Sequence, residues 1–99
     1  MDGHILIVDD EASLRQTMAR ILQRAGYEVT TAANAKECFM LITEHSFDLV
    51  YLDIRMPDMN GLELLKVIHE KRPDLAVILF TAQPDLNSAV EAVRSGATD

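Results

Sequence analysis

The sequence has a single cysteine, few basic residues and no long apolar run. The lone cysteine, Cys38, cannot form an internal disulfide, which favours a reducing cytoplasm. Nine Lys and Arg residues stand against sixteen Asp and Glu residues and give a net charge of −7. Direct nucleic-acid binding by this segment is not expected, because such binding depends on Lys and Arg. No apolar run approaches the roughly 18 residues of a membrane-spanning helix, and no signal segment opens the chain. We expect a cytoplasmic protein without membrane contact.

The chain of 99 residues is long enough for one domain with its own core. Apolar residues make up 48 % of the sequence and charged residues 25 %, which is typical of a globular domain and not of a disordered segment. A chain of this size buries about two-thirds of its unfolded surface and needs no metal or disulfide to fold. We expect a single domain over residues 1–99.

Short apolar runs alternate with amphipathic stretches along the chain. The runs at residues 5–8, 49–52 and 76–80 predict buried strands, and the more polar run at 27–31 predicts an edge strand. After each run, apolar residues recur at spacings of three and four, which predicts a helix with one inward face. The expected inward residues of the four helices are, in chain order, Leu14, Met18, Ile21, Leu22 and Ala25; Ala35, Cys38, Phe39 and Ile42; Leu62, Leu65 and Ile68; and Leu86, Ala89, Val90 and Val93.

Polar residues indicate where helices begin and which surfaces face water. Asn34 is expected to cap the second helix, and Asn60 the third. Three arginines of the first helix are expected on a solvated face, with a docking patch as the alternative: Arg15, Arg20 and Arg24.

Four strand–helix units predict an α/β fold, with an open parallel sheet, right-handed crossovers and helices on both faces. Ligands of such sheets bind outside the carboxyl ends of the strands. Asp9 and Asp10 follow the first strand, Asp53 follows the third and Thr81 follows the fourth. These four residues are therefore the candidates for a functional site.

Three carboxylates that converge at one edge of a sheet repel one another. Two like charges about 4 Å apart repel by about 1 kcal/mol in water and by about 4 kcal/mol at an effective dielectric near 20. Either one carboxyl group stays protonated or a cation binds among them, and oxygen ligands of this kind suit Mg²⁺. The alternative from the residues alone is that Asp9 and Asp10 only favour the start of the first helix and that Asp53 only forms a turn.

Four stretches carry a family resemblance: residues 8–11 (VDDE), 53–61 (DIRMPDMNG), 80–82 (FTA) and 95–99 (SGATD). In this order they resemble the receiver domain of two-component response regulators. The resemblance implies a flavodoxin-like (CheY-like) fold and a phosphoacceptor that switches conformation, not a metabolic enzyme. It also implies a sensor histidine kinase or phosphotransfer protein as partner, and an output domain in the parent chain.

The same resemblance implies roles for individual residues. Asp53 would accept the phosphoryl group from a phosphohistidine or a small acyl phosphate. Asp10 and Asp53 would bind Mg²⁺ directly (with Mn²⁺ as a substitute), the backbone carbonyl of Arg55 would be a further ligand, and Asp9 would act through water. Two residues after the fourth strand would contact the phosphoryl group: Thr81 through its hydroxyl, as the switch, and Ala82 through its backbone N–H.

The resemblance fails at the end of the chain. Receivers have a fifth strand and helix with a Lys on the loop between them, and this sequence stops at Asp99 before reaching them. We therefore expect a receiver cut short, with self-association through an exposed fourth strand and slowed phosphorylation. Two alternatives stay open: a degenerate receiver that acts only as an interaction module, and an aspartyl-nucleophile phosphatase. The phosphatase would use a second Asp where this chain has Arg55.

Overall fold

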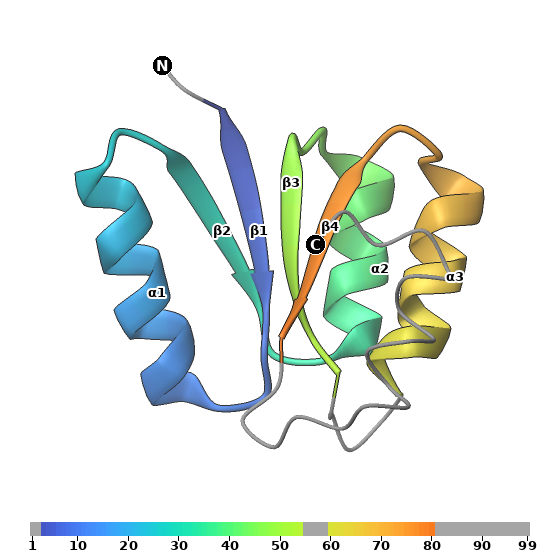
Figure 1. The fold of residues 1–99 in the computed structure, drawn as a ribbon, viewed down its shortest axis with the longest axis horizontal. Helices are drawn as coiled ribbons and strands as arrows, with labels where there is room; N and C mark the ends of the chain where they lie inside the picture. The colour runs from blue at the N-terminus through green and yellow to red at the C-terminus, as the bar shows by residue number, and fades with distance from the viewer. Residues whose placement is uncertain (1–2, 55–59, 81–99) are drawn as a thin grey trace.

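The computed structural model describes residues 3–54 and 60–80 (Figure 1). Within these residues, four strands form one parallel sheet in the order β2-β1-β3-β4. The strands are β1 (His4–Val8), β2 (Glu28–Ala32), β3 (Leu49–Asp53) and β4 (Ala76–Phe80). The predicted parallel sheet is confirmed, and so is the edge position of the polar second strand.

Three helices connect these strands and cover both faces of the sheet. They are α1 (Ala12–Arg24), α2 (Ala35–Glu44) and α3 (Gly61–Lys71). Figure 1 shows α1 on one side of the sheet and α2 with α3 on the other, as the alternating pattern predicts. The predicted fourth helix lies outside the described residues. In the described ranges, no helix is long and apolar enough to cross a membrane.

Side-chain caps fix the starts of two helices. The Asn34 side chain accepts a hydrogen bond from the Glu37 backbone N–H at 2.9 Å, and Asn60 accepts one from the Leu62 backbone N–H at 2.7 Å. Both caps are confirmed, and each satisfies a backbone donor that has no partner within its own helix.

The main core lies between the sheet and the pair α2 and α3. Leu6 and Val8 of β1 point into it together with Val50 and Leu52 of β3, because alternate residues of a strand face the same side. The buried cluster consists of Leu6, Val8, Ala32, Ala35, Cys38, Ile42, Val50, Leu52, Leu64, Leu65, Ile68 and Val77.

Three residues expected on inward helix faces are exposed, and one of them, Ala25, lies at the C-cap of α1. Ile21 of α1 is 62 % exposed and Phe39 of α2 is 43 % exposed. Consecutive helical residues lie about 100° apart around the axis, and the inward sides are occupied by their neighbours, the half-buried Leu22 and the fully buried Cys38. The predicted inward faces were therefore too wide, and the predictions for Ile21, Ala25 and Phe39 are wrong.

The strand order places the loops after β1 and β3 side by side. β1 and β3 are neighbours, with Val8 paired to Leu52. The strand that follows β1 in the chain, β2, lies on one side of this pair, and the strand that follows β3, β4, lies on the other side. In open parallel sheets, ligand sites form where the order reverses in this way. Asp9 and Asp10 follow β1 at this point, and Asp53 ends β3.

Candidate metal centre

The structure brings together the three carboxylates at the ends of β1 and β3. One oxygen each from Asp9, Asp10 and Asp53 can be chosen so that all three lie within 4.8 Å of one another. Asp9 is 1 % exposed and Asp53 is 8 % exposed, whereas Asp10 is exposed. The cluster is therefore a partly buried acidic site that opens to solvent on the side of Asp10.

Asp9 is held at three points. Its backbone N–H donates to the carbonyl oxygen of Ala32 at 3.1 Å, which extends the pairing of β1 with β2 by one residue. Its Oδ1 accepts from the backbone N–H of Glu11 at 3.0 Å, and its carbonyl oxygen accepts from Nη1 of Arg15 at 2.7 Å. The position of this acidic side chain is fixed by both neighbouring elements, β2 and α1.

The second carboxylate oxygen of Asp9 is buried without a hydrogen bond. Among the described residues, Oδ2 of Asp9 is the buried side-chain oxygen that lacks a partner. Burial raises the pKa of Asp9 above its ordinary value of 3.8, and the hydrogen bond from Glu11 opposes that rise. An unsatisfied buried acceptor costs about 1–3 kcal/mol. Such an oxygen beside two further carboxylates calls for a cation.

The donor set of the cluster fits Mg²⁺. Magnesium is bound by oxygen ligands at about 2.0–2.1 Å, so opposite ligands of one ion lie about 4.2 Å apart. The 4.8 Å span of the three carboxylates is close to that separation. The cluster contains oxygen ligands alone, with no histidine or cysteine, which favours magnesium over zinc.

Gly61 packs directly behind Asp53. Its backbone N–H donates to the carbonyl oxygen of Ile54 at 2.7 Å. A Cβ atom at Gly61 would collide with the carbonyl oxygen of Asp53 and lie 2.6 Å from Cα of Ile54. The sequence identifies the start of α3 but not this contact, and the glycine at the first helical position is the only signal of it.

The structure corrects the expectation for Arg15. Arg20 and Arg24 are exposed as predicted, but Arg15 is partly buried, and its guanidinium turns back to the carbonyl of Asp9. Its position on α1, about 20° around the axis from the half-buried Leu22, is on the sheet-facing side. The interpretation of Arg15 as part of a solvated face is wrong.

The remaining predicted site residues lie outside the described residues. They are Arg55, Thr81 and Ala82. Their assigned roles stay predictions.

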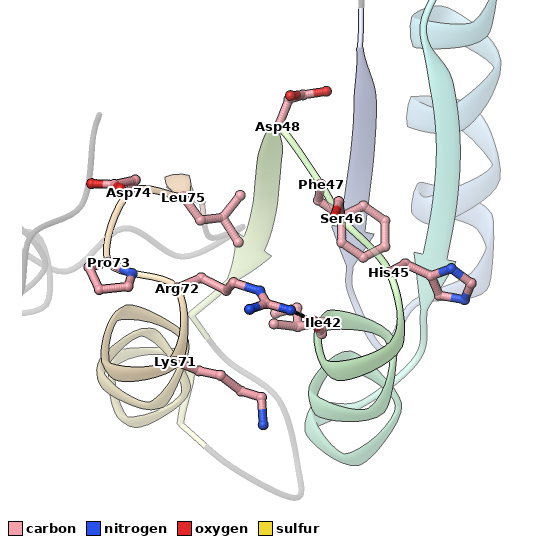
Figure 2. Close-up of a pocket in the computed structure, with 10 residues that line it drawn as sticks. All are labelled: Ile42, His45, Ser46, Phe47, Asp48, Lys71, Arg72, Pro73, Asp74 and Leu75. Carbon is pink, nitrogen blue, oxygen red and sulfur yellow. Dashed lines mark hydrogen bonds between the residues drawn. The ribbon is translucent and has the colours of Figure 1, made fainter.

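A hollow of about 380 Å³ lies at the opposite end of the sheet, away from the acidic cluster. Figure 2 shows it between the last turns of α2 and α3. The side chains of Lys71, Asp48 and Asp74 point apart around it, and Arg72 crosses it to donate to the carbonyl of Ile42 at 3.1 Å. No group of polar side chains converges there, so the acidic cluster is the stronger candidate site.

Comparisons with known proteins agree with the fold. The response regulator receiver domain family matches residues 5–99. The DNA-binding transcriptional regulator NtrC of Escherichia coli K12 is 42 % identical over 97 residues, which cover 98 % of this chain and 21 % of NtrC. The chain therefore spans about a fifth of the length of this relative.

Two solved structures show the same architecture. A CheY-like response regulator receiver domain protein from Methanospirillum hungatei JF-1 has a TM-score of 0.92 and 39 % identity, over 96 % of this chain and 76 % of that one. The response regulator TrrA from Thermotoga maritima, in complex with Mg²⁺ and BeF, has a TM-score of 0.86 and 37 % identity, over 95 % of this chain and 82 % of that one.

Proposed function

Because this chain belongs to the response regulator receiver domain family, we propose that it accepts a phosphoryl group on Asp53 in a Mg²⁺-dependent reaction. The donor is a phosphohistidine of a sensor histidine kinase or phosphotransfer protein, and a small acyl phosphate can replace it. Phosphorylation then changes the conformation through Thr81. The chain is a phosphoacceptor in signal transduction and not a metabolic enzyme.

The observation that carries this proposal is the unpaired buried oxygen of Asp9 beside Asp53. A chain that needed only a helix cap would leave no buried carboxylate oxygen unsatisfied, because that state costs free energy. A divalent cation offsets the cost and at the same time removes the repulsion among the three carboxylates. The Mg²⁺ in the TrrA structure supports this choice of ion.

Different residues of the chain have different roles in the proposed phosphoryl transfer. A carboxylate oxygen of Asp53 attacks phosphorus, an O–P bond forms, and the P–N bond of the phosphohistidine breaks so that the imidazole leaves with the electron pair. Mg²⁺, when bound, supplies positive charge that lets the anionic carboxylate approach the anionic phosphoryl group. Asp10, Asp53 and the carbonyl of Arg55 would hold the ion, with Asp9 acting through water, and Mn²⁺ would be a substitute.

Two residues after β4 complete the proposed phosphoryl site. The Thr81 hydroxyl donates to a phosphoryl oxygen and couples phosphorylation to the outer surface, and the backbone N–H of Ala82 donates to a second oxygen. Both assignments rest on the family resemblance.

The partners of the parent protein follow from its relatives. NtrC, a DNA-binding transcriptional regulator, is about five times as long as this chain. We propose that an output domain follows the receiver in the parent chain and makes any contact with DNA, in the cytoplasm. Self-association along β4 stays a prediction, and a monomeric sedimentation profile at high micromolar concentration would contradict it.

Mass spectrometry tests the phosphoacceptor. The chain is incubated with a small acyl phosphate and Mg²⁺, and the expected result is a mass increase of one phosphoryl group. Asp53→Asn abolishes the increase, because an amide is not a nucleophile here. Asp48→Asn is the matched control, since Asp48 lies at the other end of β3, and it keeps the increase. Without any mass increase in the unchanged chain, the interaction-module alternative replaces the proposal.

A further inference from the structure

Arg15 joins the first turn of α1 to the loop that carries two of the three carboxylates. Its Nη1 donates to the carbonyl oxygen of Asp9 at 2.7 Å, and the bond is partly buried. A hydrogen bond from a charged donor in such a setting is short and about twice as strong as a neutral one. Arg15 is therefore a fixed part of the loop and not a freely moving surface cation.

We propose that Arg15 is a positioning residue for the metal centre, which sets the orientation of the peptide between Asp9 and Asp10. This inference rests on the proposed function, because it concerns the affinity of the acidic cluster for Mg²⁺. Arg15 contacts neither the ion nor the phosphoryl group. It acts through the backbone of the residues that do.

The carbonyl of Asp9 is a position from which Arg15 can influence the backbone of Asp10. The carbonyl oxygen of Asp9 lies in the same planar peptide unit as the nitrogen and Cα of Asp10. The Asp10 side chain is exposed, so packing does not fix its direction. The guanidinium of Arg15 restrains rotation of this peptide, and so limits the positions from which the Asp10 side chain reaches the acidic cluster.

The other two bonds of Asp9 restrain the following peptide less directly than the bond from Arg15 does. The bond to Ala32 holds the backbone N–H on the β2 side, and the bond from Glu11 holds Oδ1 of the side chain. The bond to Ala32 does not restrain the peptide that follows Asp9, and the bond from Glu11 spans this peptide but reaches it through the rotatable side chain of Asp9. Loss of the Arg15 guanidinium therefore loosens Asp10 while it leaves β1 paired.

A purely electrostatic role for Arg15 predicts the opposite effect on metal binding. A cation close to a metal site repels a divalent ion, so its removal raises the affinity for Mg²⁺ by a few-fold. A positioning role predicts that removal lowers the affinity. The sign of the change separates the two roles.

The test measures the Mg²⁺ dissociation constant by isothermal titration at pH 7 for the unchanged chain, Arg15→Met, Arg15→Lys and Arg20→Met. Arg20 lies on the same helix and is exposed, so Arg20→Met removes the same charge without the contact. We expect binding three- to tenfold weaker in Arg15→Met, partial recovery in Arg15→Lys, and a change within twofold in Arg20→Met. Unchanged or tighter binding in Arg15→Met overturns the inference.

A second measurement without metal covers the case in which Arg15→Met folds poorly. Amide hydrogen exchange of Asp10 and Glu11 is expected to be at least tenfold faster in Arg15→Met than in Arg20→Met, and Arg15→Lys is expected to lie between the two. Equal exchange contradicts the positioning role. If the unchanged chain takes up no Mg²⁺, the proposed function fails, and this inference fails with it; if it binds Mg²⁺ and Arg15→Met binds equally well, the inference fails alone.

Discussion

Acidic residues at the two ends of the parallel sheet differ in their hydrogen bonding. At the amino end, Oδ2 of Asp48 accepts a hydrogen bond from the backbone N–H of His4 at 2.8 Å. The His4 ring is in turn hydrogen bonded to the Thr30 hydroxyl at 2.6 Å. At the carboxyl end, Asp9 is buried with one oxygen unpaired among the described residues. The carboxylate of Asp48 at the amino end is hydrogen bonded within the protein, whereas Oδ2 of Asp9 at the carboxyl end is available to a ligand.

This difference separates a structural carboxylate from a functional one. Both Asp48 and Asp9 lie next to a strand end, and both accept a backbone N–H. Only Asp9 is also buried beside two other carboxylates. Its burial therefore lowers the stability of the metal-free chain in exchange for a binding site, and the predictions below test that contrast.

The largest expected effect is a loss of stability on substitution of Gly61 at the carboxyl end, which we compare with substitution of Gly3 at the amino end. Gly61→Ala places Cβ against backbone atoms of Asp53 and Ile54, which cannot move without shifting β3, so we expect a loss of about 2–3 kcal/mol in unfolding free energy. Gly3→Ala meets Oδ2 of Asp48 at 2.9 Å and has a φ of +124°. The Asp48 side chain can turn away, so the expected loss is about 1–2 kcal/mol.

Urea unfolding of the two glycine variants measures both losses. Gly61→Ala is also expected to weaken Mg²⁺ binding, because it displaces the backbone of Asp53, whereas Gly3→Ala leaves the binding unchanged. Equal effects of the two substitutions on stability and on metal binding would remove the contrast between the ends.

Opposite signs are expected for amides at the two acidic positions. Asp9→Asn removes the buried charge and gives the unpaired position a donor that can reach a neighbouring carboxylate, so we expect a gain of about 1–3 kcal/mol in unfolding free energy without metal. Asp48→Asn exchanges a charged acceptor for a neutral one and is expected to lose about 0.5–1.5 kcal/mol. Thermal unfolding in the presence of a chelator measures both changes in stability. A loss of stability in Asp9→Asn would contradict the claim that the unpaired Asp9 carboxylate destabilises the metal-free chain.

The pH dependence of the Asp9→Asn gain follows from the raised pKa. Since burial raises the pKa of Asp9 in the folded chain above the 3.8 of the unfolded chain, protonation favours folding. This stabilisation is complete below 3.8 and is lost as the pH rises through the folded-state pKa. The advantage of Asp9→Asn is therefore largest at pH 7 and shrinks toward pH 3.8. Chelator-treated samples unfolded across this range measure it, and a gain that is constant with pH points to another cause.

The smallest effect is expected at the hollow of the amino end (Figure 2). Arg72→Met removes the hydrogen bond to the carbonyl of Ile42 and is expected to cost about 0.5–1.5 kcal/mol of unfolding free energy. Magnesium binding and phosphorylation stay unchanged, because this residue lies at the other end of the sheet. A Mg²⁺ titration of the variant checks this, and weaker binding would show that the two ends are coupled.

The sequence predicted the sheet and the convergence of the acidic cluster because both follow from short-range patterns. A continuous apolar run of four or five residues identifies a strand, and the next residue necessarily lies at the carboxyl end. Asp9, Asp10 and Asp53 were placed together by this reasoning, without any knowledge of distances. The parallel order of the strands then decided which ends are neighbours.

The sequence could not predict features that depend on tertiary distances. The apolar spacing of a helix defines a broad face, so Ile21 and Phe39 fell at its border and lie exposed. The conformation of a long side chain such as Arg15 depends on which acceptor is near, here the carbonyl of Asp9. The need for Gly61 arises only when α3 approaches the backbone of β3.

The most direct test of the central claim is a calorimetric titration of the metal-free chain with Mg²⁺ at pH 7, next to Asp53→Asn and Asp48→Asn. The account predicts uptake of about one ion per chain, since the three carboxylates form one site. Uptake is strongly weakened in Asp53→Asn and unchanged in Asp48→Asn. An absence of uptake by the unchanged chain, or equal uptake by Asp53→Asn, would contradict the claim that the acidic cluster is a divalent-metal site.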